Sequence, residues 1–172
     1  FDRLGKPDHC QWINVDFEHV IAMRQAYHAK YDNVRDIAAT LEQTDWLDAI
    51  ASNQPTMVIA EGVFPYLHAP QLRNLLSKLS EHFQNPQLVF DAYNKLGTWL
   101  LRMDGSIRVT GAQLCSTLQD IACVIDEGQL KPNGFYHADH LPHFSRLSRN
   151  LIRCWQALPV FSGLVGLYQC GL

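Results

Sequence analysis

The stretch that decides the fold is PTMVIAEGVFPYL, residues 55–67, in which an apolar run ends at an acid and a glycine. Thr56–Ala60 is almost continuously apolar, which is typical of a parallel strand covered on both faces. Glutamate is rare in strands and is almost never buried alone, so Glu61 requires a partner. That partner is either a ligand cation or hydroxyl, or an arginine of the core. Gly62 allows the backbone to approach such a ligand closely.

A second acid, Asp16, ends an earlier apolar strand in CQWINVDFEHV, residues 10–20. In open α/β sheets, ligands bind outside the carboxyl ends of the strands, and a carboxylate there can accept hydrogen bonds from ribose hydroxyls. Aspartate is also a favoured residue immediately before a helix. The local pattern leaves both roles open for Asp16.

Apolar periodicity and turn residues predict strands that alternate with helices. We expect strands at Gln11–Val15, Asn33–Leu41, Thr56–Ala60, Gln87–Asp91, Asp120–Gly128 and Leu164–Cys170, and helices at Phe17–Tyr31, Asp45–Ala51, His68–Phe83, Asn94–Met103, Gly111–Gln119 and Pro142–Leu158. Residues 130–142 are expected to form an irregular loop. Such alternation predicts a mostly parallel sheet with right-handed crossovers in a single domain, residues 1–172, and the last strand is expected at an antiparallel edge.

Composition excludes some classes of function. A net charge of -3 and a pI near 6.2 disfavour binding to nucleic acid. No apolar run approaches the roughly 20 residues that span a bilayer, and no signal peptide is visible, so a cytoplasmic protein without membrane contact is expected. The five cysteines are scattered, without a C-x-x-C motif, which indicates reduced thiols and no zinc knuckle.

Four segments together resemble a known family. They are WINVDFEHVIAMRQAYH (residues 12–28), IAATLEQTDWLDAI (37–50), PTMVIAEGVFPYL (55–67) and LVFDAYN (88–94). Their letters and spacing are similar to successive motifs of the leucine carboxyl methyltransferase family, and within it to the bacterial branch of tetracenomycin polyketide O-methyltransferases. The most distinctive block is E-G-V-x-x-Y-L, and the likeness weakens after about residue 105.

The resemblance implies a Rossmann-like, seven-stranded class I methyltransferase sheet that binds S-adenosylmethionine. Asp16 and Phe17 would then lie at the cofactor ribose, and Glu61 and Gly62 would contact the cofactor after the fourth strand of the family fold. The segment that lines the adenine usually reads Asp-Leu in the family. Here it reads Thr40-Leu41, which weakens or changes the side-chain hydrogen bond to the adenine.

The resemblance also implies that this chain is the C-terminal portion of the methyltransferase domain. The family's glycine-rich motif, G-x-G-x-D-T-R, would stand immediately before FDRLG (residues 1–5) and is not in this sequence. An upstream arginine that grips the cofactor's carboxylate is missing as well. A sheet without its central strand has exposed edges that aggregate or recruit another strand. We therefore expect no turnover by these 172 residues alone, and self-association through the edges.

The implied activity is methyl transfer to a carboxylate or phenolic hydroxyl of a small substrate of the polyketide type. A carboxylate is already ionised at neutral pH, whereas a phenol benefits from a general base. The candidates for catalytic or substrate-facing roles are Tyr66 and Tyr93, beyond strand ends, and His137 and His140, in the loop. Packing or an ordinary solvated loop explains the same residues, and no metal site is expected.

Two other classes of function stay open at this point. One is a non-catalytic, truncated Rossmann-like module that binds a partner or oligomerises. The other is a nicotinamide-dependent oxidoreductase, which also carries an acid at a strand end. The E-G-V-x-x-Y-L block has no place in the dehydrogenase pattern, which disfavours the oxidoreductase.

Overall fold

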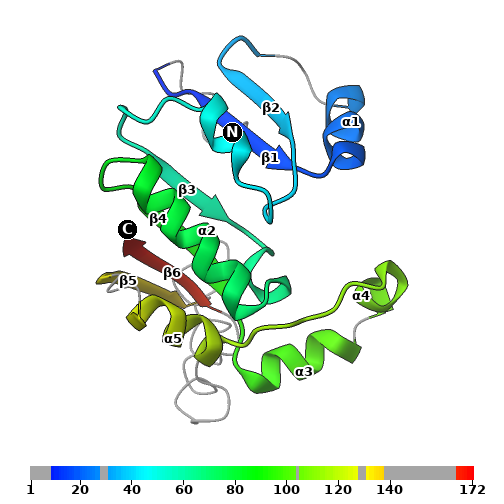
Figure 1. The fold of residues 1–172 in the computed structure, drawn as a ribbon. Coiled ribbons are helices and arrows are strands. Elements are labelled where there is room, and N and C mark those ends of the chain that lie inside the picture. The colour runs from blue at the N-terminus through cyan, green and yellow to red at the C-terminus, as the bar shows by residue number, and fades with distance from the viewer. Residues whose placement is uncertain (1–8, 28–30, 104, 128–130, 138–165) are drawn as a thin grey trace, which may run out of the picture. The chain divides into compact units, whose positions relative to one another are not determined.

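The computed structural model describes residues 9–27, 31–103, 105–127, 131–137 and 166–172 (Figure 1). Its internal contacts divide the chain into two compact units, Phe1–Ala51 and Ser52–Leu172, and each is described by itself. Within the described residues, six strands form a two-stranded and a four-stranded sheet. The predicted α/β class is confirmed, whereas the seven-stranded sheet and the single domain stay predictions.

The first unit is a short βαβ arrangement. Its elements are β1 (Trp12–Asp16), α1 (Glu18–Tyr27), β2 (Val34–Ala38) and the 3-10 helix η2 (Asp45–Ala49). β1 and β2 are parallel, with Asp16 opposite Ala38. The helix predicted over Phe17–Tyr31 extends too far, since α1 ends at Tyr27. Tyr31 belongs to the turn before β2, where its carbonyl accepts a hydrogen bond from the backbone N–H of Val34. η2 is attached to β2 through Arg35, whose Nη1 donates to the Ala49 carbonyl at 2.7 Å.

The second unit contains the longer sheet. Its elements are β3 (Met57–Ala60), η3 (Phe64–Tyr66), α2 (Ala69–His82), β4 (Gln87–Ala92), α3 (Lys95–Met103), α4 (Gly105–Thr110), α5 (Leu118–Glu127), β5 (Lys131–His137) and β6 (Gly166–Gly171). The strand order is β3-β4-β6-β5. β3 and β4 are parallel, and β6 is antiparallel to both of its neighbours. The predicted antiparallel C-terminal strand is therefore confirmed.

The position predicted for that strand was wrong. β6 lies between β4 and β5, so β5 and not the C-terminal strand occupies this edge of the sheet. Residues 131–137, expected to form an irregular loop, are the strand β5. The reason is tertiary, since the segment is extended by its pairing with β6 and carries little strand propensity of its own.

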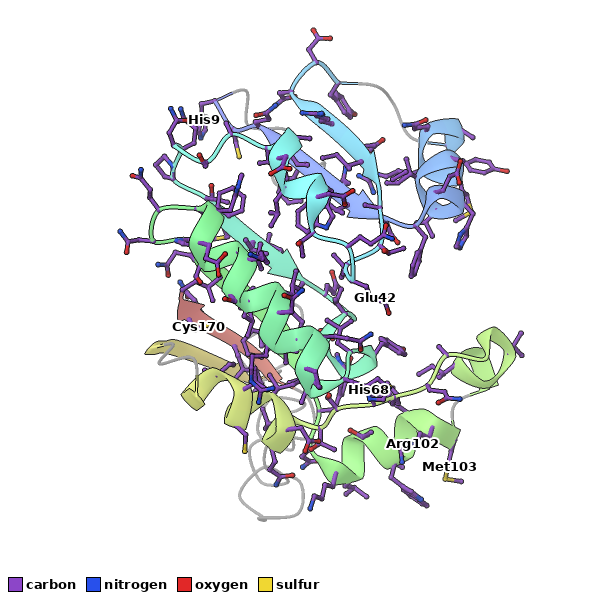
Figure 2. All side chains as sticks on the ribbon, in the orientation of Figure 1. His9, Glu42, His68, Arg102, Met103 and Cys170 are labelled. Atoms are coloured by element: carbon purple, nitrogen blue, oxygen red, sulfur yellow. The ribbon has the colours of Figure 1, made fainter. Side chains whose placement is uncertain are left out.

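The expected strand Asp120–Gly128 is wrong as well, because residues 118–127 form the helix α5. Ile121, Val124 and Ile125 are buried at helical spacing, 0%, 3% and 9% exposed, and a short apolar run of this kind fits either element locally. The predicted helix at Gly111–Gln119 is mostly a connecting segment. Arg102 of α3, labelled in Figure 2, holds part of this segment. Its Nη2 donates to the Leu114 carbonyl at 2.8 Å.

The core of the second unit lies between its sheet and two helices. α2 buries the apolar face that the sequence predicted, Leu72, Leu75, Leu76 and Leu79, each at most 5% exposed. α2 also contacts α5, and both helices lie over the same face of the sheet (Figure 1). Phe90 of β4 packs against Phe64 and Tyr168, with ring centroids 4.9 and 5.4 Å apart. This packing fixes the carboxyl ends of β3 and β4.

β3 differs from its prediction on one face. Met57 and Ile59 are 58% and 52% exposed, so this strand is not covered on both sides as its apolar run suggested. Ala60, on the alternate face, is 7% exposed. Within the described residues β3 is an edge strand, paired on one side with β4.

Two further expectations concern the chain as a whole. Cys10, Cys115, Cys123 and Cys170 are free thiols, as predicted, and Cys154 lies outside the described residues. None of the described helices combines the length and the apolar character needed to cross a membrane.

Candidate functional site

The turn after β3 begins with Glu61 and Gly62, both exposed to solvent. Glu61 therefore does not need the buried partner that the sequence suggested. Gly62 has φ +64°, a left-handed conformation that side-chain-bearing residues rarely adopt. Its N–H donates to Oδ1 of Asp91 at 2.7 Å, which fixes the turn against the neighbouring strand.

Asp91 lies at the carboxyl end of β4 and is only 8% exposed. Its second oxygen, Oδ2, accepts a hydrogen bond from the hydroxyl of Tyr93 at 2.9 Å. A buried carboxylate is costly unless donors satisfy its oxygens, and here a backbone N–H and a phenol do so. One side chain thus joins the ends of two parallel strands to a tyrosine beyond them.

Tyr93 is half-buried, and burial is the main cause that raises its pKa well above the usual value. The hydrogen bond to Asp91 raises it further, because the hydroxyl must keep its proton to donate. The negative charges of Asp91 and Glu61 act in the same direction. The Tyr93 phenol is therefore protonated at neutral pH and is unsuited to act as a general base.

Tyr66 is placed by the short helix η3. Phe64 is 1% exposed and anchors this helix in the core. The carbonyl of Pro65 accepts hydrogen bonds from the backbone N–H groups of Cys115 and Ser116 at 2.7 and 3.1 Å. These contacts hold Tyr66, which is half-buried, in the neighbourhood of Tyr93.

His137 is the last residue of β5, and its backbone reaches the same rim. It lies opposite Gly166 of β6, which in turn lies opposite Ala92 at the carboxyl end of β4. The side chain of His137 is outside the described part of the chain, and so is the whole of His140. Within the described residues, no group of three or more His, Cys, Asp or Glu side chains could hold a metal ion.

The first unit has its own rim at the ends of β1 and β2. The exposed Asp16 accepts a hydrogen bond from the Phe17 N–H at 2.8 Å, and its carbonyl accepts one from Ala39 at 2.9 Å. Thr40 and Leu41 follow directly, both half-buried, so the predicted ribose and adenine residues gather at one end of this sheet. Phe17 is 55% exposed and stacks on His19.

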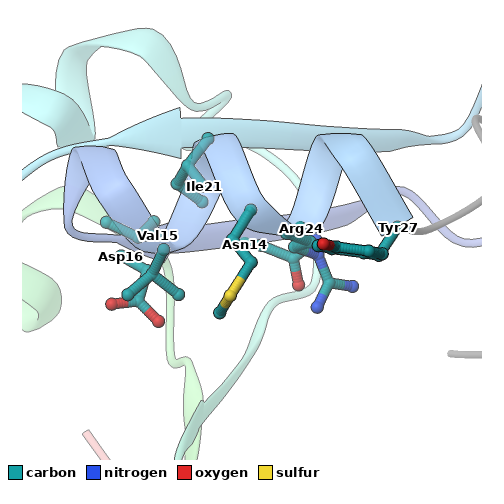
Figure 3. A pocket seen from close by; sticks show the side chains of 8 residues that line it. Asn14, Val15, Asp16, Ile21, Arg24 and Tyr27 are labelled. Carbon is teal, nitrogen blue, oxygen red and sulfur yellow. The ribbon is translucent and has the colours of Figure 1, made fainter.

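A hollow of about 390 Å³ lies between β1 and α1 (Figure 3). The polar side chains that line it are those of Asn14, Asp16, Arg24 and Tyr27. Figure 3 shows the Asp16 carboxylate and the Arg24 guanidinium extending to the same side. Arg24 also pairs with Asp36 at 3.4 Å, and Asn14 donates to Asp36 at 2.8 Å. The hollow therefore combines an exposed carboxylate with a cation that is held in place.

The predicted site residues thus fall into two groups. Glu61, Gly62, Tyr66 and Tyr93 gather at the β3–β4 rim, and Asp16, Phe17, Thr40 and Leu41 gather at the β1–β2 rim. The two groups belong to different units. That the carboxylates of Asp16 and Glu61 converge on one ligand stays a prediction.

Asp91 is the residue that sequence reasoning missed at this site. The strand predicted over Gln87–Asp91 ends at this acid, and no role was predicted for it. The sequence does contain a signal for such a role, because Asp91 stands between Phe90 and Ala92 in a buried strand. A buried carboxylate at that position requires hydrogen-bond donors from other residues. The structure supplies those donors from Gly62 and Tyr93.

The comparisons with known sequences agree with these motifs. Residues 2–80 match the family described as leucine carboxyl methyltransferase. Over 113 residues the chain is 34% identical to the tetracenomycin polyketide synthesis O-methyltransferase TcmP of Streptomyces glaucescens. The match covers 64% of this chain and 41% of TcmP, so the chain spans about two fifths of that relative.

Solved structures show the fold. An S-adenosylmethionine-dependent methyltransferase from Archaeoglobus fulgidus superposes with a TM-score of 0.61 at 11% identity, over 100% of this chain and 80% of that one. The N-methyltransferase NodS from Bradyrhizobium japonicum, in complex with S-adenosylhomocysteine, gives 0.53 at 13%, over 95% and 67%. The described α/β elements therefore follow a methyltransferase-like fold. Residues 2–80 are thus similar in sequence to the leucine carboxyl methyltransferase family, and the chain is similar in fold to S-adenosylmethionine-dependent methyltransferases.

Proposed function

We propose that this chain belongs to an S-adenosylmethionine-dependent O-methyltransferase. The methyl group goes to a carboxylate or a phenolic hydroxyl of a small acceptor of the polyketide type. The observation that carries the proposal is the 34% identity to TcmP over 113 residues, together with the family match over residues 2–80. That matched segment contains both acids that end strands, Asp16 and Glu61.

The residues present fit the cofactor chemically. Exposed carboxylates at strand ends accept hydrogen bonds from ribose hydroxyls or from a cationic ligand group, and Asp16 and Glu61 are both exposed. Thr40 and Leu41 follow β2, where the family resemblance implies the adenine. When bound, S-adenosylmethionine supplies an electrophilic methyl group, so the protein has to align the acceptor oxygen and exclude water.

A binding measurement on the full-length gene product tests the cofactor assignment. Calorimetry with S-adenosylhomocysteine and, separately, with NAD separates a methyltransferase from an oxidoreductase. Asp16→Asn and Glu61→Gln should each weaken S-adenosylhomocysteine binding about 10-fold or more, since a hydrogen bond to a charged group contributes ~1.5–3 kcal/mol. Asp48→Asn, an exposed acid on η2, is the matched control and should bind normally.

Binding of NAD in place of S-adenosylhomocysteine would overturn the proposal. Binding of neither ligand would favour the non-catalytic module. With binding established, transfer of labelled methyl groups to panels of aromatic carboxylic acids and phenols identifies the acceptor class. Absence of transfer to either panel would contradict the substrate assignment alone.

A further inference from the structure

The hydrogen bonds of Asp91 decide which way the Tyr93 hydroxyl points. A carboxylate only accepts hydrogen bonds, so in the 2.9 Å contact between Tyr93 Oη and Asp91 Oδ2 the tyrosine must be the donor. The other oxygen of Asp91 is committed to the Gly62 N–H at 2.7 Å. Tyr93 has one hydroxyl proton, and it faces Asp91. The Tyr93 oxygen can therefore still accept a hydrogen bond through its lone pairs, but it has no further proton to donate.

The surroundings of Tyr93 reinforce this polarity. Tyr93 lies beyond the end of β4, at the rim that also carries Glu61. The negative charge of Glu61 contributes to the raised pKa of the Tyr93 hydroxyl. A negative group placed here would meet lone pairs and a carboxylate. A neutral hydroxyl can donate to Tyr93 without such repulsion.

We propose that Tyr93 determines specificity by accepting a hydrogen bond from a hydroxyl of the methyl acceptor, and that Asp91 is the positioning residue that fixes Tyr93 as an acceptor. The inference rests on the proposed function and narrows the methyl acceptor to molecules that carry a hydroxyl donor. A site built around a substrate hydroxyl discriminates strongly against an analogue that lacks it, because a polar group is then left unpaired.

Asp91→Asn tests the proposal because it exchanges the donor and acceptor roles in the hydrogen bond between residue 91 and Tyr93. The Gly62 N–H needs an acceptor, so the Asn amide oxygen must face Gly62 and its NH₂ group must face Tyr93. Tyr93 then accepts from residue 91 and turns its own proton outward. The variant should bind a ligand that accepts a hydrogen bond from Tyr93 more tightly than a ligand that donates one.

The probes are 1-naphthol and its methyl ether, 1-methoxynaphthalene, with dissociation constants measured by NMR on the full-length gene product. The wild type should prefer naphthol about 10-fold or more. Tyr93→Phe should bring the ratio close to one, and Asp91→Asn should reverse it. Ser80→Ala, which removes an exposed hydroxyl on α2, should leave the ratio unchanged. An unchanged preference in Tyr93→Phe or Asp91→Asn overturns the proposal.

A second readout needs no ligand. Ultraviolet titration of tyrosine ionisation, taken as the difference from Tyr93→Phe, follows Tyr93 alone. Asp91→Asn should lower the pH at which Tyr93 ionises by about 1 unit or more, since the hydrogen bond and the charge of Asp91 both oppose ionisation. An unchanged titration contradicts the positioning role. Absence of methyl transfer by the full-length wild type would instead count against the proposed function, because neither readout depends on turnover.

Discussion

At the scale of a single residue, the backbone conformation of Gly62 shapes the turn that leads from β3 to the candidate site. Its φ of +64° turns the chain away from β3 and directs its N–H at Asp91. A Cβ at this position would meet no atom within 4 Å, so space is not the constraint. The constraint is the backbone conformation itself, which costs other residues about 1–2 kcal/mol.

Gly62→Ala should therefore lower the free energy of unfolding by about 1–2 kcal/mol, as measured by urea denaturation. Gly105→Ala is the control, because Gly105 also has open space but begins the helix α4 without a positive φ. There the unfolding free energy should be unchanged or higher, since alanine favours helices. Equal losses in both variants would contradict the role of the left-handed turn.

At the scale of a single element, the residues at the start of α5 show why this segment is a helix and not a strand. Thr117 precedes the helix, and both its N–H and its hydroxyl donate to Oδ2 of Asp120, at 2.8 and 2.7 Å. The order Thr-x-x-Asp is a capping pattern that marks a helix start. The apolar run over Asp120–Gly128 predicted a strand, whereas the capping pattern before it indicates the helix that is observed.

The Asp120 cap predicts a dependence of stability on pH. The hydrogen bonds from the Thr117 N–H and hydroxyl lower the pKa of Asp120. Because the folded pKa lies below the unfolded value of about 3.9, the stabilisation is present above that pH and is lost as the pH falls through the folded pKa. Asp120→Asn should cost ~0.3–1 kcal/mol at pH 7, and this difference should shrink below about pH 4.

Urea denaturation at pH 7 and pH 3 measures this difference. Gln119→Ala, an exposed change on the same helical turn, should give the same effect at both pH values. A difference between wild type and Asp120→Asn that is constant with pH would rule out the charged cap.

At the scale of the whole molecule, the sheets of both units have edges that are unpaired within the described residues. The β3 edge also carries exposed apolar side chains, Met57 and Ile59, on one face. Unpaired strands and apolar patches favour association between chains. The sequence predicted such edges from the family resemblance, and the oligomeric state stays a prediction.

Ile59→Lys should reduce concentration-dependent self-association of the 172-residue chain, because a charge on an edge strand opposes pairing. Size-exclusion chromatography with light scattering across a concentration series measures the change in mass. Val109→Lys on α4 replaces another exposed apolar residue, 89% exposed, and should have no effect. A wild-type chain that is monomeric at every concentration would show the expectation to be wrong.

The sequence by itself determined the strands with strong apolar runs, the buried face of α2 and the acids at the carboxyl ends of β1 and β3. These features are local, since they depend on periodicity and on residue types that strongly favour one environment. The family resemblance added the cofactor class. None of this required knowledge of which segments meet.

Only the tertiary structure decided that β6 lies inside the sheet, that residues 131–137 are a strand and that Asp91 joins Gly62 to Tyr93. Each of these facts depends on partners distant in the sequence. A strand becomes one by pairing, and a buried carboxylate acquires its role from the donors that reach it. Periodicity along one segment carries no information about those partners.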